Sequence, residues 1–454
     1  MIFASTTFLF LFLPSAIIAL LFTPPRFRSA ILLFFSLIFY AYGEIRYGLI
    51  MIFSIALDYI CGIMIESSKK EMNRKLWLLI SVVGNLGLLF WFKYSGYLAR
   101  LINQALDLSM PIPQILLPLG ISFFTFQTMS YSIDVYRKEV KAERNLVDFG
   151  AYVTMFPQLI AGPIVRYSDI ALELKAKVNL WDRLDHGFNL FVLGLGSKVL
   201  LANALAAAIA PIEALALENT SKLLWMIQTL YFGFQLYFDF AGYSLMAIGL
   251  GHMFGFTFPA NFNYPYISSS VSEFFRRWHI TLGDWFKSYL YIPLGGSRVP
   301  LKKVIFNLLV VWFITGLWHG ADTQFVVWGL WLGLWVILEK IGLSKLNLPL
   351  WFKHTLTLVI IFISWSIFNA PSLSEWSQRF IHLDWISAAS LEGVMLRNGL
   401  GLLIISMILS GPWIKTWFER FPSWTKQGFY TLILLLSIAS LIHGSLNPFL
   451  YFRF

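Results

Sequence analysis

The chain has 454 residues, of which 58% are apolar, 18% are aromatic and only 13% are charged. An ordinary soluble domain carries about 25% charged residues, so this composition excludes a disordered chain and argues strongly against a soluble globular protein. The single cysteine, Cys61, excludes an intramolecular disulfide and a cysteine-rich metal site. In so apolar a chain, the net charge of +10 is typical of cytoplasmic loops beside anionic lipid and gives no reason to expect nucleic acid.

Apolar stretches recur along the chain, and many reach the roughly 20 residues that a helix needs to cross a bilayer. We expect them at 5–23, 29–43, 45–66, 75–95, 115–136, 145–165, 184–213, 221–255, 303–320, 323–342, 352–370, 396–412 and 428–446. The stretch 221–255 is long enough for two broken pieces. No Lys or Arg precedes the first stretch, which indicates a membrane span rather than a cleaved signal. Since no linker or repeat divides the sequence, we expect a single all-α integral membrane domain over residues 1–454.

The distribution of Lys and Arg predicts that the N-terminus lies outside the cytoplasm. With that orientation the first three inside loops hold ten basic residues, and the intervening outside loops hold three. Strict alternation fails at 145–165, where Pro157 and Pro163 break the helical pattern. We expect this segment to enter the membrane and return to the same side, which indicates an internal cavity. The basic loop 256–303 then also lies inside.

A polar and aromatic segment follows the stretch 221–255. Within it, Glu273 and Arg277 are four residues apart and are expected to pair on one helix. Arg276 and His279 are three apart, so we expect both to face one cavity. Arg276 or Arg277 would then bind a phosphate-bearing donor, while His279 polarises or orients a substrate. The alternative is that arginines at a membrane interface bind lipid headgroups.

A second candidate lies at the end of the stretch 303–320. His319 comes 16 residues after Lys303, which places it about 24 Å across the membrane. A neutral buried imidazole there is suited to general-base chemistry, and Asp322 is placed to orient it. The alternative is a structural histidine bonded to a carbonyl. Asp239, among aromatic residues, is either a paired structural group or a cavity group.

The remaining sequence patterns concern helix packing and metal binding. Two glycine pairs with helical spacing, Gly251 with Gly255 and Gly329 with Gly333, favour close helix packing. No metal-ligand spacing and no phosphate-binding glycine loop is present. The sequence therefore gives no indication of a bound metal.

Several long blocks resemble the membrane-bound O-acyltransferase family, in particular its branch of bacterial polysaccharide O-acetylation proteins such as those acting on alginate. They occur in the family order within about 115–333. The blocks are LPLGISFFTFQ at 117–127, DVYR at 134–137, FPQLIAGPIVRY at 156–167, FDFAGYS at 238–244, NFNYPYISSSVSEFFRRWHITLGDWFKSYLYIPLGG at 261–296 and GLWHGA at 316–321.

The resemblance implies a multi-span helical domain whose re-entrant segments enclose a transmembrane tunnel for acyl transfer. It identifies His279 and His319 as the paired histidines of the family, with His319 essential. We accordingly expect both as catalytic residues. Substrate-binding residues are expected at Arg276, Arg277, Trp278, Asn261, Asn263, Trp318 and Asp239. Among these, His279 with Asn261 or Asn263 is expected to hold the donor or the developing oxyanion.

The resemblance also implies the substrates and location. An acyl thioester, either acetyl-CoA or an acyl carrier, is expected as substrate rather than as a bound cofactor. A polysaccharide acceptor and a periplasmic acyltransferase partner are expected at the bacterial cytoplasmic membrane. Leu245, Thr323 and Leu332 depart from the branch pattern, and Leu245 agrees with the D-alanyl-transfer branch. D-alanyl transfer, a transporter and a lipid-linked glycosyltransferase are the alternative functions.

Overall fold

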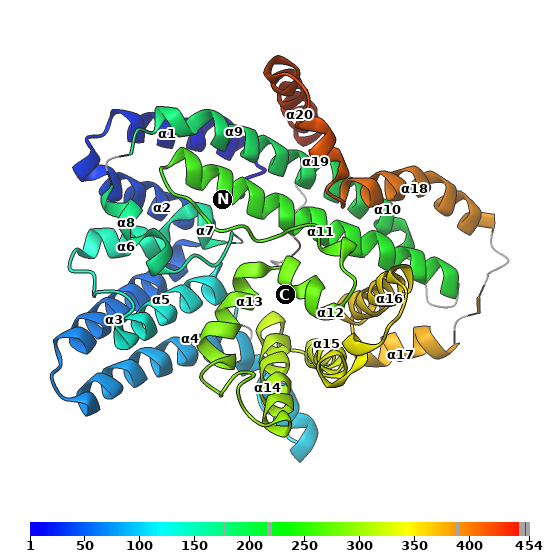
Figure 1. Ribbon diagram of the computed structural model, residues 1–454, viewed down its shortest axis with the longest axis horizontal. Helices are drawn as coiled ribbons and strands as arrows, with labels where there is room; N and C mark the ends of the chain where they lie inside the picture. Colours follow the sequence, from blue (N-terminus) through cyan, green and yellow to red (C-terminus); the bar gives the residue numbers. More distant parts are fainter. Residues whose placement is uncertain are drawn as a thin grey trace. The chain divides into compact units, whose positions relative to one another are not determined.

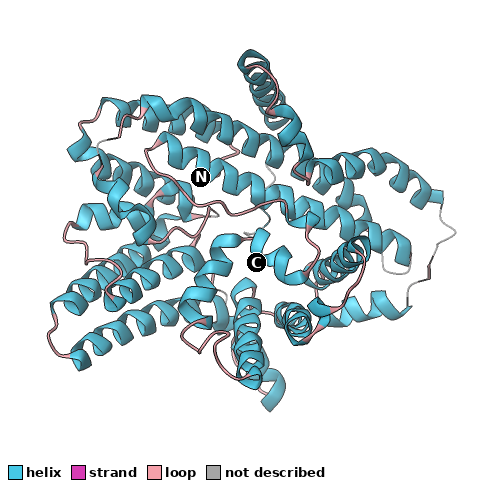
Figure 2. Ribbon diagram, in the orientation of Figure 1, coloured by secondary structure: helices cyan, strands magenta, loops and turns pink. Residues whose placement is uncertain are grey.

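Helices dominate the computed structural model of this chain (Figures 1 and 2). The structure describes residues 1–113, 115–160, 162–176, 178–215, 220–382, 384–385, 390–444 and 450, with 382 and 390–398 described by their backbone. In these ranges the regular structure is helical, apart from an isolated antiparallel bridge between Phe262 and Trp278. The prediction of an all-α chain is confirmed.

Seven helical segments within the described ranges are long and apolar enough to cross a membrane. They are Pro25–Ser67, Glu71–Leu106, Trp181–Glu213, Leu301–His319, Thr323–Ile341, Leu350–Phe368 and Ser423–His443. The first of these contains two helices, α2 (Arg28–Glu44) and α3 (Gly48–Ser67), as the sequence predicts. The multi-span membrane architecture is therefore confirmed, while the outside position of the N-terminus stays a prediction.

The described residues fall into two compact units, and the first contains Met1–Phe191 and Ser244–Pro259. Its helices are η1 (Phe8–Phe12), α1 (Leu13–Phe22), α2, η2 (Pro25–Phe27), η3 (Ile45–Tyr47), α3, α4 (Glu71–Leu106), α5 (Ile121–Arg137), α6 (Leu146–Thr154), α7 (Phe156–Leu159), α8 (Tyr167–Lys175) and most of α9 (Trp181–Gly196). The single-domain organisation of the whole chain stays a prediction.

A buried polar cluster joins three helices of this unit. Asp58 of α3 accepts hydrogen bonds from the Ser132 hydroxyl (2.8 Å) and the Asn85 amide (2.7 Å), while the Ser81 hydroxyl also donates to it. Cys61, one turn further along α3, is a buried free thiol. Interhelical hydrogen bonds of this kind hold spanning helices together where burial of apolar surface against lipid gains little.

The segment 145–165 contains the predicted interruption. α6 ends at Thr154 and α7 begins at Phe156, with Met155 in a non-helical conformation between them and Pro157 in the first turn of α7. The residues of α7 are all buried in protein, which is the condition for an irregular backbone at membrane depth. The helix break is confirmed, and the return of the chain to the same side stays a prediction.

The second unit contains Val192–Tyr243 and Ala260–Phe454. Its helices are η4 (Ser197–Ala202), α10 (Asn203–Glu213), most of α11 (Lys222–Met253), η6 (Pro265–Ile267), α12 (Val271–Arg277), α13 (Ile280–Phe286), η7 (Lys287–Tyr291), α14 (Leu301–His319), α15 (Thr323–Ile341), η8 (Leu343–Lys345), α16 (Leu350–Phe368), α17 (Leu373–His382), α18 (Ser390–Leu409), α19 (Trp413–Phe418) and α20 (Ser423–His443). α11 is one continuous helix, although the length of the stretch 221–255 would have allowed two broken pieces.

α14 and α15 pack against each other (Figure 1), and glycines set their separation. A methyl group added at Gly329 would lie 2.4 Å from the Trp312 carbonyl oxygen, and one at Gly316 would lie 2.4 Å from the Phe325 carbonyl oxygen. The predicted close packing at Gly329 and Gly333 is therefore confirmed. The Gly251 and Gly255 pair differs, because Gly251 faces Phe258 and Gly255 follows the end of α11 with a φ of +94°.

Candidate active site

A short antiparallel pairing positions the first histidine. The backbone N–H of Asn263 donates to the Arg277 carbonyl (2.9 Å), and the N–H of Ile280 donates to the Asn261 carbonyl (3.0 Å). These bonds flank the bridge between Phe262 and Trp278. The pairing brings Asn261, which is 18 residues away in sequence, beside His279.

Two groups hold the start of α12, which leads into this pairing. The Ser270 hydroxyl accepts from the Glu273 N–H (3.0 Å), as an N-cap residue does. The carboxylate of Glu339, on α15, accepts from the N–H groups of Val271 (2.6 Å) and Ser272 (2.9 Å). Bonds from helix N-terminal N–H groups to a carboxylate are charge-assisted, so they fasten α12 to α15. Glu339 is not among the site residues expected from the sequence, although a carboxylate inside an apolar spanning stretch is a signal of a functional or structural site.

His279 is the second of the two residues between α12 and α13 and precedes the first residue of α13. It is 3% exposed and has a φ of +47°, a conformation that is rare for residues other than glycine. Such a backbone persists when the surroundings hold it, and it is common at functional sites. Burial lowers the pKa of His279 to about 3, so the imidazole is neutral at physiological pH. Its Nδ1 lies 3.1 Å from Oδ1 of Asn261.

His319 is the last residue of α14 and is 7% exposed. Aromatic rings surround it: the ring centroids of Trp328 and Phe368 lie 4.8 and 5.6 Å from that of the imidazole, both near perpendicular. Trp318 contacts both histidines, with centroid distances of 5.0 Å to His319 and 6.0 Å to His279. Asp322 begins α15 as its N-cap residue, and its expected action on His319 stays a prediction.

One cavity of about 180 Å³ connects the two histidines. Its walls are mostly apolar and aromatic. The lining residues are Phe275, Trp278, His279, Leu282, Gly283, Phe286, Lys287, Tyr291, Leu308, Val311, Trp312, Thr315, His319 and Trp328. Among the lining residues Lys287 and Gly283 are exposed, whereas both histidines are buried. An apolar pocket with a few convergent polar groups is the usual form of a small-molecule site.

The two arginines of α12 are placed differently from the expectation. Arg276 is exposed and does not line the cavity with His279. A spacing of three residues places two side chains on one face only within a single helix, but α12 ends at Arg277 and the left-handed conformation of His279 turns the chain. Arg277 forms the predicted pair with Glu273, at 3.0 Å, and also donates to the Asn263 carbonyl (3.2 Å). Asn263 itself is exposed outside the cavity lining.

Asp239 lies in a buried ion pair with Lys198 of η4. Its other carboxylate oxygen accepts from the backbone N–H of Leu450 (2.7 Å). Breaking such a pair leaves an uncompensated buried charge. Asp239 is not among the cavity-lining residues, which favours the structural interpretation over a substrate contact.

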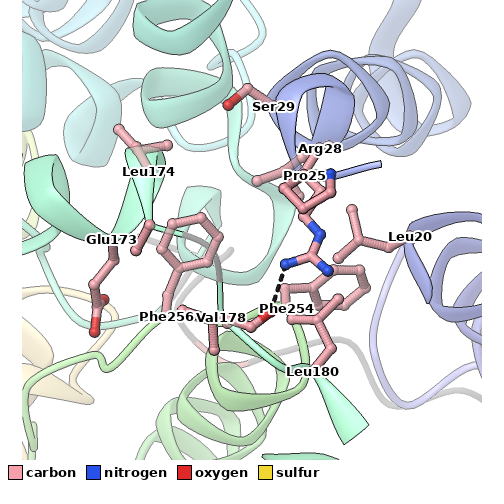
Figure 3. A pocket seen from close by; sticks show the side chains of 13 residues that line it. Leu20, Pro25, Arg28, Ser29, Glu173, Leu174, Val178, Leu180, Phe254 and Phe256 are labelled. Carbon is pink, nitrogen blue, oxygen red and sulfur yellow. Dashed lines mark hydrogen bonds between the residues drawn. The ribbon is translucent and has the colours of Figure 1, made fainter. Parts of the chain in front are cut away.

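A second hollow lies in the other unit, between the α1–α2 turn and the segment after α8 (Figure 3). Arg28 reaches into it, with its hydrogen bond to Val178 drawn as a dashed line in Figure 3. The donor is Nη1 and the acceptor is the Val178 carbonyl, at 2.6 Å. The free volume is about 20 Å³, which is room for about one water molecule. This hollow is too small for a substrate, so the cavity at His279 and His319 is the candidate active site.

Comparison with known proteins identifies the family of this chain. The model of the membrane-bound O-acyltransferase family matches residues 119–374, a range that contains both histidines and the cavity lining. A probable alginate O-acetylase AlgI of Pseudomonas putida is 34% identical, with both chains covered in full. The AlgI of Pseudomonas aeruginosa is 39% identical over 90% of this chain and 80% of its own. A peptidoglycan O-acetyltransferase of Helicobacter pylori is 30% identical over all of this chain and 98% of its own. The chain therefore belongs to the membrane-bound O-acyltransferase family and is an O-acyltransferase.

Proposed function

We propose that this enzyme moves an acetyl group from a cytoplasmic thioester to a hydroxyl acceptor, for O-acetylation of an exported or cell-envelope polysaccharide. The observation that carries the proposal is that His279 and His319 line one apolar cavity together with the exposed Lys287. The names of the relatives, which refer to alginate and peptidoglycan, support a polysaccharide as the final acceptor.

His319 serves as the general base in this proposal. Its ring nitrogen takes the proton of the acceptor hydroxyl while the oxygen attacks the thioester carbonyl. The new C–O bond forms and the C–S bond breaks. The proton on His319 then passes to the departing thiolate, which restores the neutral imidazole. The surrounding rings of Trp318, Trp328 and Phe368 exclude water, which would otherwise hydrolyse the thioester.

The thioester enters the cavity beside Lys287. An ammonium group there suits the phosphate of a CoA or of an acyl carrier's prosthetic arm, because phosphates pair well with lysine. Lys287 fits this function better than Arg276, which is exposed outside the cavity lining. The acceptor approaches from the opposite side of the membrane, and an extracytoplasmic acyltransferase completes delivery to the polymer.

The test uses the full chain in lipid nanodiscs with acetyl-CoA or an acetylated acyl carrier, and mass spectrometry of the acceptor. His319→Ala should lower the rate of transfer by at least about 10²-fold, because a positioned base contributes about 10²–10⁴. His443→Ala is the matched control, since His443 is exposed at the end of α20. Transfer at the control rate by His319→Ala would refute the assignment of the base.

D-alanyl transfer is the second candidate, because Leu245 agrees with that branch. Supplying D-alanyl and acetyl thioesters in competition distinguishes the two functions. In cells, the same question is answered by the acyl groups that disappear from envelope polymers when the gene is deleted. Loss of D-alanyl esters with acetyl esters unchanged would replace the first proposal by the second.

A further inference from the structure

The hydrogen bonds around Asn261 identify which atom of its side-chain amide faces His279. The backbone N–H of Thr281 donates to Oδ1 of Asn261 at 3.3 Å, and the Thr281 hydroxyl lies 2.9 Å from the same atom. A backbone N–H is only a donor, so the amide atom that it meets is the oxygen. This fixes the orientation of the amide independently of His279.

The protonation of the imidazole follows from that orientation. Nδ1 of His279 lies 3.1 Å from the same Asn261 oxygen, which has lone pairs and no proton. Nδ1 therefore carries the hydrogen. Since burial lowers the pKa of His279 to about 3, the neutral ring has one N–H, and Nε2 keeps its lone pair.

We infer that Asn261 is a positioning residue that holds His279 in the Nδ1–H tautomer, so that His279 meets the reactants through Nε2 as a hydrogen-bond acceptor. Its partner in the reaction is then an O–H or S–H group. A neutral His279 in this tautomer has no proton to offer a thioester carbonyl or an oxyanion. In this inference His279 accepts a hydrogen bond from a reactant, in place of the expectation that it holds the developing oxyanion. The identity of the group that Nε2 meets rests on the proposed acyl transfer, whereas the tautomer does not.

The surroundings keep this arrangement in place. Asn261 is 1% exposed, and its own carbonyl accepts from the Ile280 N–H, so both its backbone and its side chain are bound to the segment that carries His279. The ring of Phe240 packs edge-on against the imidazole, with centroids 4.7 Å apart. Hydrogen bonds in such a buried site are stronger than in water, and losing one costs more.

The O–H or S–H group that Nε2 meets belongs either to the hydroxyl acceptor or to the departing thiol, and kinetics of His279→Gln distinguish the two. If the group belongs to the hydroxyl acceptor, His279→Gln should raise the KM for the acceptor and leave the KM for the thioester unchanged. If it is the thiol of the departing carrier, the same change should slow turnover with both KM values unchanged. A weakened affinity for the intact thioester alone would overturn the inference, because a thioester has neither an O–H nor an S–H.

The direct test is ¹⁵N magnetic resonance of the full chain in nanodiscs, with labelled histidine. The seven histidines are separated by subtracting the spectrum of His279→Gln. We expect the His279 signal of the Nδ1–H tautomer, and an Nε2–H signal would overturn the inference. This measurement needs no turnover, so its failure is distinct from failure of the proposed function.

Variants of Asn261 test the consequence for the rate. Asn261→Leu removes the acceptor oxygen and should cost about 10- to 100-fold in turnover, as the loss of an orienting partner does at metal-bound histidines. Asn261→Asp keeps an oxygen in the same place and should retain the Nδ1–H signal. Asn347→Leu is the matched control in an exposed loop. Equal turnover and an unchanged tautomer in Asn261→Leu would overturn the positioning function.

Discussion

Gly329→Ala tests whether the close approach of α14 and α15 sets the geometry of the active site. The added methyl carbon would lie 2.4 Å from the Trp312 carbonyl oxygen and 3.0 Å from Cα and N of Gly316. Ordinary contacts begin at 3.4 Å, so the methyl group is about 1 Å too close. All three neighbouring atoms are backbone atoms, which move only when the two helices separate.

Separation of the helices acts directly on the site, because His319 ends α14 and its neighbour Trp328 adjoins Gly329 on α15. A misplacement of about 1 Å costs up to about 10²-fold in rate. Overpacking of this kind also costs about 1–3 kcal/mol of stability. We therefore expect Gly329→Ala to lose most of its turnover and to melt at a lower temperature.

The assay combines acyl transfer in nanodiscs with thermal unfolding of the same preparation. Gly342→Ala is the matched control, because Gly342 is the C-cap residue of the same helix and a methyl group there meets nothing within 4 Å. The control should match the parent protein in both measurements. Parent-like turnover and melting in Gly329→Ala would refute the reasoning that the glycine contact fixes the distance between the helices.

Three further predictions concern the cavity lining, the support of α12 and the buried imidazole. Lys287→Ala should raise the KM for the thioester more than Arg276→Ala does, because Lys287 lines the cavity; steady-state kinetics with equal KM values for the two variants would contradict this. Glu339→Ala leaves two N–H groups of α12 without their carboxylate and should lower the melting temperature by more than Glu419→Ala, which removes an exposed carboxylate 3.9 Å from its lysine; equal melting temperatures would contradict it. The pKa of His279 is about 3 in the folded protein, below the usual value of 6.5. As the pH falls from about 6.5 towards 3, the imidazole of the unfolded chain therefore takes up a proton while that of the folded chain does not, and the free energy of unfolding should decrease. Melting curves of His279→Gln should show a weaker loss over that range, and an identical loss would indicate that other groups are responsible.

Much of the fold was accessible from composition and local spacing. Apolar length predicts spanning helices because the bilayer imposes it, and the i,i+4 rule predicts the pair of Glu273 with Arg277 because both residues lie within α12. The two prolines of 145–165 predict an interrupted helix, since proline removes a backbone donor. Each of these inferences uses residues within one element.

The site required information that crosses elements. The spacing of Arg276 and His279 predicts that both lie on one face of a helix, but the left-handed backbone at His279 takes this residue out of the helix that contains Arg276. Lys287 was visible only as one of several loop cations, and its place at the cavity depends on how η7 meets α14. The orientation of the Asn261 amide depends on Thr281, which no helical or strand periodicity relates to it.

The burial of the lone thiol in α3 has a practical consequence for chemical labelling. Cys61 is 1% exposed, and the chain has no other cysteine. A cysteine introduced on an exposed loop is then the single accessible target for a maleimide, without removal of a native residue. Membrane-impermeant reagents applied to intact cells can thus report which loops face outward, beginning with those at Lys69 and Ser109. The same chemistry can place a fluorophore beside the cavity and follow the arrival of the acyl donor.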